Sequence, residues 1–212
     1  MADVFAKNAA TSAEEAAKIV PRAEFRVFGK DVIAGVIDHM WKCKAQLFKA
    51  RVMPPETYIL SKKTNDANVK VRDGLLDIKT KTSETPEGFE VFQPRGKFQF
   101  PVQKAELAVI LENLGVEAPL EKDAYTFDEF CALAKAHPDL ALVEVEKCRY
   151  GFSVNGVICE YAKVWFNGAL VETACCESEN YEAMAGAVEA LGLKDAPNTN
   201  YLKAAKHVIG WA

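Results

Sequence analysis

The sequence predicts an α+β protein in which an antiparallel eight-stranded β-barrel carries helices packed on its outside. Three dipeptides that favour tight hairpin turns lie between alternating apolar and polar runs: Asp73-Gly74, Asn155-Gly156 and Asn167-Gly168. Seven or eight antiparallel strands with several cations of one parity favour a closed or nearly closed barrel. The amphipathic helices between and after the strands need an apolar surface on which to pack.

The first half of the chain is expected to be mostly strands. In order, we expect a strand over 23–29, a helix over about 32–42 capped by Asp31, an irregular stretch closed by Pro54-Pro55, a strand over 56–61, a turn at Asn65-Asp66, a hairpin over 68–82 and a strand over 88–100 that bends at Pro94-Arg95-Gly96. The hairpin, with its Asp73-Gly74 turn, is the strongest of these predictions.

The second half is expected to begin with helices and then to form a three-stranded meander. We expect a helix over 102–114 that stops at Gly115, a helix over 127–136 that starts with a capping box, strands over 140–151, 153–167 and 169–179, and helices over 181–191 and 200–208. The predicted organisation is a leader over residues 1–20, helical or disordered, and a single domain over residues 21–212 with a helical insert over about 102–138.

The hairpin over 68–82 has one apolar and one charged face, because side chains alternate along a strand. Lys70 and Arg72 share a face of its first strand, and Asp77, Lys79 and Lys81 share a face of its second. The charged face can lie outside in solvent. Alternatively, helices cover the apolar face and the charged face lines a wet interior. The number of amphipathic helices favours the second arrangement.

Composition excludes several functional classes. The net charge is −4, so generic nucleic-acid binding is not expected and any anion site must be a local group of Lys and Arg. No apolar run approaches 18 residues, and residues 1–20 lack the order of a secretion signal, so we expect a cytoplasmic protein. The six cysteines form no Cys-x-x-Cys pair, which favours reduced structural thiols over zinc or disulfides.

Over roughly residues 24–211 the chain resembles the CYTH superfamily, the triphosphate tunnel enzymes. The resemblance depends on the order of five segments: Glu24-Phe-Arg26, the basic hairpin from Lys70-Val-Arg72 to Leu76-Asp-Ile-Lys79, Lys147-Cys-Arg149-Tyr150, Glu177-Ser-Glu179 and Asn200-Tyr201-Leu202-Lys203. It implies an antiparallel eight-stranded tunnel whose cations hold a triphosphate and whose carboxylates hold Mg²⁺ or Mn²⁺.

The resemblance also implies roles for single residues. Glu24, Glu177 and Glu179 would be the catalytic and metal-binding carboxylates. The phosphate-binding cations would be Arg26, Lys70, Arg72, Lys79, Lys81, Arg95, Lys147 and Arg149. The expected partner is a small polyanion, a triphosphate or a nucleotide, with neither nucleic acid nor membrane involved, and a homodimer is compatible with the sequence.

The first strand departs from the family pattern Glu-x-Glu-x-Lys, because Arg26 and Phe28 stand where the second Glu and the Lys are expected. One metal-ligand position is therefore a cation. Three functions remain open: metal-dependent hydrolysis of inorganic or nucleoside triphosphate, with adenylate cyclisation as a variant on the same scaffold; a non-catalytic phosphate or polyphosphate binding module; and an interaction protein whose charged face is merely solvated.

Overall fold

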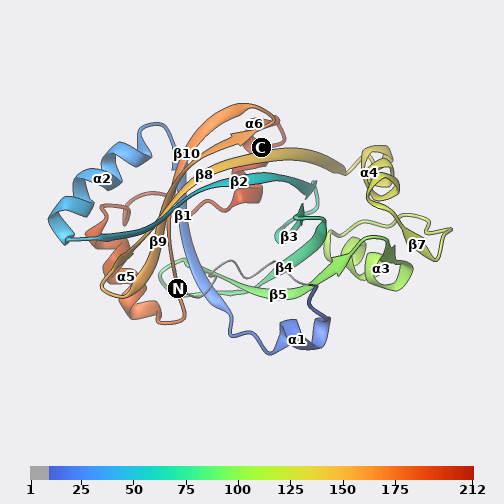
Figure 1. Cartoon of the computed structure of the whole chain (residues 1–212), viewed down its shortest axis with the longest axis horizontal. Helices are drawn as coiled ribbons and strands as arrows, with labels where there is room; N and C mark the ends of the chain where they lie inside the picture. Colours follow the sequence, from blue (N-terminus) through green and yellow to red (C-terminus); the bar gives the residue numbers. More distant parts are fainter. Residues whose placement is uncertain (1–9) are drawn as a thin grey trace, which may run out of the picture. The chain divides into compact units, whose positions relative to one another are not determined.

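The computed structural model describes residues 10–212 (Figure 1). The predicted leader is therefore described only from residue 10 onward, and its first nine residues lie outside the described part. Residues 10–20 contain one short helix, α1 (Ala13–Ala17). It starts with a capping box, in which the Ser12 hydroxyl accepts from the Glu15 amide and the Glu15 carboxylate accepts from the Ser12 amide.

Eight strands form one hydrogen-bonded ring, as predicted. They are β1 (Arg22–Gly29), β2 (Gln46–Ser61), β3 (Thr64–Arg72), β4 (Leu75–Glu84), β5 (Glu90–Gln99), β8 (Leu140–Val154), β9 (Val157–Phe166) and β10 (Ala169–Ser178). Their order is β1-β10-β9-β8-β2-β3-β4-β5, and the order closes on itself through the antiparallel β1–β5 pair. The short strands β6 (Val102–Gln103) and β7 (Ala124–Tyr125) form a separate pair.

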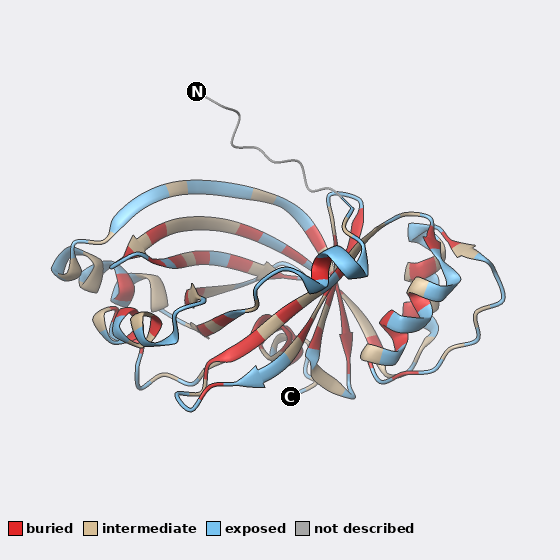
Figure 2. Ribbon diagram, turned by 90° about the horizontal axis from the view of Figure 1, so that it is seen from below, coloured by how far each residue is buried: buried red, intermediate tan, exposed pale blue. Residues whose placement is uncertain are grey.

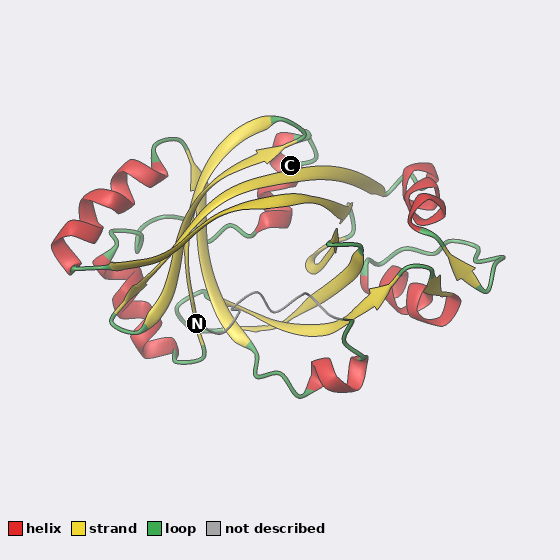
Figure 3. Ribbon diagram, in the orientation of Figure 1, coloured by secondary structure: helices red, strands yellow, loops and turns green. Residues whose placement is uncertain are grey.

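Five further helices complete the described chain, and Figure 3 shows them beside the strands. They are α2 (Val32–Cys43), α3 (Lys104–Asn113), α4 (Phe127–Ala136), α5 (Tyr181–Ala190) and α6 (Tyr201–Val208). Each was expected from the sequence to within about two residues at most ends. None of the helices between residues 10 and 212 is long and apolar enough to cross a membrane.

The chain divides into two compact units that share four of the strands. The first unit contains residues up to 19, 56–80 and 94–142, and the second contains residues 20–55, 81–93 and 143–212. Each unit has its own core of buried side chains. Figure 2 shows buried and exposed residues alternating along many of the strands, as expected where the two faces of a strand have different surroundings.

In the second unit, helices cover the apolar face of the sheet. Phe25 and Val27 of β1 are buried in one cluster with Val36 of α2 and Met184 and Val188 of α5. Both helices contact β9 and β10, and Figure 1 draws them on the same side of these strands. The side chains of opposite parity on β1 therefore lie on the face that α2 and α5 leave uncovered.

The first unit repeats this arrangement with different elements. Val69 of β3 and Ile78 of β4 are buried together with Leu107 and Ile110 of α3 and Phe130 of α4. Thr126 caps α4, and its hydroxyl accepts from the Glu129 amide, as the capping box predicts. Within each unit, helices thus cover the apolar strand faces, as expected, and the charged side chains lie on the opposite faces.

Backbone conformation explains the three hairpins. The first turn residue has a positive φ at Asp73 (52°), Asn155 (49°) and Asn167 (48°), and the glycine that follows each has one too. Two consecutive positive φ angles are the requirement of a type I′ turn, which Asn-Gly and Asp-Gly tolerate best. These dipeptides therefore fix the register of the strands that carry the charged side chains.

Four local predictions were wrong. The stretch before Pro54-Pro55 is not irregular, because β2 runs through both prolines from Gln46. Asn65-Asp66 lies within β3, and the turn falls at residues 62–63 instead. Asp31 precedes α2 in a left-handed conformation (φ 60°) and makes no side-chain cap. Finally, residues 102–103 belong to β6 rather than to α3, because they pair with β7.

Candidate functional site

The uncovered face of the second unit brings together residues that are far apart in the sequence. Glu24 of β1 lies directly opposite Glu177 of β10, and Arg26 lies opposite Cys175, which in turn lies opposite Glu160 of β9. Directly opposed residues on neighbouring strands point to the same face. The predicted meeting of Glu24, Arg26 and Glu177 on one face is therefore present in the register, with Glu160 added from β9.

Arg26 is the buried centre of this face. Its guanidinium donates to Glu24 Oε1 at 2.6 Å and to Cys175 Sγ at 3.0 Å, and it lies 3.8 Å from Glu160 Oε1. Burial by itself would lower the pKa of Arg26, but Cys175, Glu24, Tyr201 and Glu160 together raise it well above its ordinary value. Burial raises the pKa of the Cys175 thiol, so this sulfur faces Arg26 as a neutral acceptor.

Glu160 joins two arginines. The Arg149 guanidinium donates to Glu160 Oε2, while Glu160 Oε1 faces Arg26. Burial would lower the pKa of Arg149, and the Glu160 carboxylate raises it instead. Glu160 Oε1 is buried and has no hydrogen-bond partner within the usual distance among the described residues. Glu160 therefore holds the buried Arg26 and the half-buried Arg149 together, while one of its oxygens accepts no hydrogen bond at the usual distance.

The C-terminal segment packs onto the same face. The Arg26 guanidinium lies 4.6 Å and the Lys147 Nζ 4.4 Å from the centre of the Tyr201 ring, so two cations contact one aromatic side chain. Burial raises the pKa of the Tyr201 phenol, which keeps it neutral. Asn198 accepts from the Arg26 amide through its side-chain oxygen. The start of α6 thus helps to position the cations.

A further carboxylate, Glu90 of β5, lies directly opposite Glu24 on its other side. It is buried, and it accepts from Asn200 at 2.9 Å and from Lys203 at 2.8 Å. The predicted phosphate ligand Lys81 lies 3.9 Å from the same carboxylate. Glu90, Glu24 and Glu177 therefore form one row across three neighbouring strands.

These carboxylates pair with cations rather than with one another. Arg22 Nε donates to Glu179 at 3.2 Å and Arg22 Nη1 to Glu177 at 3.5 Å, at an exposed position. Glu24 bonds to Arg26. Between residues 10 and 212 no three His, Cys, Asp or Glu side chains lie close enough to hold a metal ion. As arranged, the predicted ligands Glu24, Glu177 and Glu179 do not fit a metal.

The first unit holds a separate charged face. Glu56 and Tyr58 of β2, Lys70 and Arg72 of β3 and Asp77 of β4 lie on one side, since Lys70 is directly opposite both Tyr58 and Asp77. Lys70 Nζ lies 3.4 Å from the Tyr58 hydroxyl and 3.7 Å from Glu56. Arg72 lies 3.7 Å from Glu56 and 3.3 Å from Asp77.

Lys70 is the perturbed cation of this face. Burial lowers its pKa to about 8, although Glu56 opposes the shift. Asp77 Oδ1 and the Asn68 side-chain oxygen are buried without a hydrogen-bond partner among the residues described. The face therefore holds a cation that is partly uncharged near pH 8 and two acceptor atoms with spare capacity.

The two other cations predicted in this unit differ in position. Lys79 lies directly opposite Asn68, on the charged face. Arg95 is exposed and donates to the Thr80 hydroxyl at 2.7 Å, and Thr80 has the parity of the buried Ile78. The structure thus brings Lys70, Arg72 and Lys79 together and places Arg95 apart from them.

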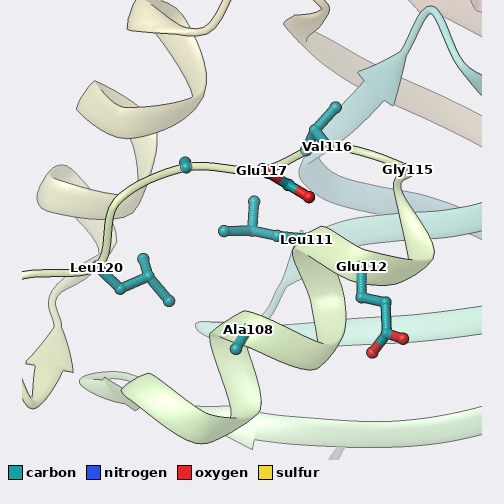
Figure 4. Close-up of a pocket in the computed structure, with 8 residues that line it drawn as sticks. Ala108, Leu111, Glu112, Gly115, Val116, Glu117 and Leu120 are labelled. Carbon is teal, nitrogen blue, oxygen red and sulfur yellow. The ribbon is translucent and has the colours of Figure 1, made fainter.

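A surface pocket of the first unit lies apart from the charged face of that unit. It has a volume of about 430 Å³ and follows α3 and the loop after it, where Leu111, Val116 and Leu120 form much of its wall (Figure 4). Its charged lining residues are Glu112 and Glu117. A wall with carboxylates and no Lys or Arg repels phosphate, so this pocket is not a candidate for a polyanion.

Sequence reasoning missed Glu56, Glu90 and Glu160, the buried carboxylates that partner the predicted cations. The Asn155-Gly156 turn carried a usable signal for Glu160, because the turn's register sets Glu160 opposite Gly151, beside Arg149. Glu90 carried no local signal, since its partners are on β1 and α6.

The fold agrees with known structures, whereas sequence comparisons found nothing: no protein-family model and no curated protein matches the chain. Among solved structures it is similar to HpAC1 from Hippeastrum, a candidate adenylyl cyclase described by its dominant triphosphatase activity. The two share 13% identity with a TM-score of 0.50, over 91% of this chain and 96% of that one.

Two further structures are similar at lower scores. A conserved hypothetical protein from Pyrococcus furiosus has 14% identity and a TM-score of 0.49, over 86% of this chain and 98% of that one. A candidate adenylate cyclase from Bacillus halodurans has 12% identity and a TM-score of 0.44, over 88% and 98%. The likeness to HpAC1 shows that the two chains share a fold, which here is the ring of eight antiparallel strands that the resemblance implied.

We predict that Glu160→Gln destabilises the protein by about 3–5 kcal/mol, because removing one member of a buried ion pair leaves the other charges uncompensated. Urea unfolding measures the change. Glu189→Gln is the matched control: the Glu189–Lys194 pair is two-thirds exposed, so its loss costs about 0–1 kcal/mol. Equal effects of the two changes would show that Glu160 does not hold the arginines.

We predict that stability depends on pH through Lys70. Its pKa is lowered to about 8 in the folded state, so the unfolded state binds this proton more tightly. The unfavourable contribution of charged Lys70 is complete below pH 8 and disappears as pH rises towards 10.5, the ordinary lysine value. Lys70→Met should therefore stabilise the protein, relative to wild type, more at pH 7 than above pH 10.

Urea unfolding of both proteins across this pH range measures the difference. Lys104→Met, at an exposed position on α3, is the control and should show a difference from wild type that does not change with pH. If the difference in unfolding free energy between Lys70→Met and wild type were also constant across this pH range, the lowered pKa of Lys70 would be contradicted.

Proposed function

We propose that the protein binds a triphosphate group, free or as part of a nucleotide, through the cations of its uncovered strand faces. The observation that carries this proposal is the burial of Arg26 and Lys147, together with the half-buried Arg149, on one strand face of the second unit. Buried cations are costly unless paired or used for binding. A polyanion can take over the pairing of these cations from the resident carboxylates Glu24 and Glu160.

Guanidinium and ammonium groups suit phosphate oxygens in different ways. Arg149 and Arg26 present planar donors that can bind two oxygens at once, whereas Lys147 supplies a point charge. In the first unit Lys70, Arg72 and Lys79 present a second group of the same chemistry. Both groups are partly neutralised by resident carboxylates, so a bound polyanion has to compete with Glu160 or Glu56 for these donors.

Metal-dependent hydrolysis of the triphosphate is the second candidate. The register favours it, because Glu90, Glu24 and Glu177 lie at one level of three neighbouring strands and carboxylate oxygens are the ligands that Mg²⁺ and Mn²⁺ prefer, but as arranged they are not close enough to hold one ion. Against it, each of these carboxylates is paired with a cation or an amide. Such an ion would supply charge neutralisation and an activated water when bound.

Binding predicts thermal stabilisation by inorganic triphosphate, since a ligand at a hundredfold excess over its Kd stabilises by about 2.7 kcal/mol. Lys147→Met keeps the apolar contact with Tyr201 but removes the charge, and should raise the Kd about tenfold or more. Lys163→Met is the control, because Lys163 is exposed and lies opposite Cys148, on the other face. No shift with wild type, or equal Kd values for both variants, would refute the proposal.

Hydrolysis predicts phosphate release from inorganic triphosphate or ATP with Mg²⁺ or Mn²⁺. Glu24→Gln and Glu177→Gln should lower kcat by at least about tenfold if these oxygens hold the ion, while Glu182→Gln, an exposed change at the start of α5, should have no effect. Triphosphate binding without any phosphate release would leave the protein as a binding module.

A further inference from the structure

The junction of α2 and β2 exposes large apolar side chains on the second unit. Trp41 near the end of α2 is 84% exposed, and Leu47 and Phe48 at the start of β2 are 56% and 58% exposed. Only two residues, Lys44 and Ala45, separate the end of α2 from the start of β2. Three large apolar side chains that are exposed within eight residues of one helix–strand junction indicate an interaction surface.

Cations lie close to these side chains in the sequence. Residues 39–55 contain four Lys and Arg and no Asp or Glu, in a chain whose net charge is −4. Lys42 and Lys44 are exposed beside Trp41. Lys42 pairs with Asp38 at 2.9 Å, at a position where both side chains are more than two-thirds exposed. We name Trp41, Lys42, Lys44, Leu47 and Phe48 the α2–β2 tip.

The backbone presents the two faces of β2 at this tip. Leu47 and Phe48 are consecutive in a strand and so point to opposite faces, yet both are exposed. Both faces are therefore accessible at this end of the strand. Lys44 ends α2 in a left-handed conformation (φ 55°), which turns the chain sharply from helix to strand. A partner that binds this tip has to contact aromatic side chains, aliphatic side chains and cations at the same time.

Charge selects the occupant. A second copy of the chain would bring a cationic tip against a cationic tip, because residues 38–55 hold four Lys and Arg and one carboxylate, Asp38, which already pairs with Lys42. An anionic lipid surface can bind both the exposed apolar side chains and the cations of the tip. Trp and Phe prefer the interface of a bilayer, with the ring among the head groups, and Lys and Arg bind anionic head groups beside it.

We propose that the α2–β2 tip docks on an anionic lipid bilayer and so holds the protein at a membrane surface. The contact is peripheral: Trp41, Leu47 and Phe48 enter the head-group region while Lys42 and Lys44 contact lipid phosphates. The expectation from the sequence was that no membrane is involved, and it rested on the lack of a spanning segment. Peripheral docking needs no such segment.

Co-sedimentation of the full chain with vesicles tests the proposal. Wild type should bind vesicles of phosphatidylcholine mixed with phosphatidylserine and not vesicles of phosphatidylcholine alone. Lys44→Glu should weaken binding about tenfold or more, since each cation near an anionic surface contributes about fivefold. Trp41→Ala should weaken it about fivefold or more, because the ring is the largest apolar group that enters the interface.

Matched controls come from α3 of the first unit. Val109 is 52% exposed and Lys104 is exposed, so Val109→Ala and Lys104→Glu make the same kinds of change away from the tip and should bind like wild type. Trp41 fluorescence, isolated by Trp165→Phe and Trp211→Phe, should shift to shorter wavelength with anionic vesicles. Equal binding by all variants, no binding by wild type, or a dimer that Trp41→Ala dissociates would overturn the proposal.

Discussion

The pairing of buried charges on the uncovered strand faces is the constraint on which the candidate site depends. Once α2 and α5 cover the apolar side of β1, alternation forces Glu24 and Arg26 onto the other side. Arg26 is almost completely buried there, so it must be satisfied by neighbours. Glu24 and Glu160 provide that pairing, and Glu160 extends it to Arg149. The cations of the second unit therefore form one connected group.

This pairing explains why Arg26 can stand where the related pattern has a carboxylate. A guanidinium at this position needs acceptors on both sides, and Glu24 and Glu160 supply them. On this face, guanidinium groups that can donate hydrogen bonds to an anion are therefore held in place by carboxylates. Because each of these carboxylates faces a cation, the carboxylates do not converge on one point where a metal ion could bind. The geometry therefore supports anion binding more directly than it supports a metal site.

Sequence reasoning was most successful where a local signal fixes the backbone. Asp73-Gly74, Asn155-Gly156 and Asn167-Gly168 predicted three hairpins, and their positive φ angles confirm the reason. It was least successful where the signal was ambiguous: Pro54-Pro55 was interpreted as the end of an irregular stretch, although β2 passes through it. Proline has no backbone N–H to donate, but its backbone can still be extended. A proline therefore weakens a strand prediction without excluding the strand.

The sequence by itself determined most of the strands, the three hairpin turns with Asp-Gly or Asn-Gly, and the parity that puts Lys70 with Arg72 and Lys147 with Arg149 on one face, because these follow from local backbone preference and alternation. Only the tertiary structure decided which carboxylates meet these cations, that Arg95 turns away from them, and that Trp41 remains exposed. Partners such as Glu160 and Tyr201 come from other strands and from the last helix. Their meeting depends on strand order and helix docking, which no local pattern encodes.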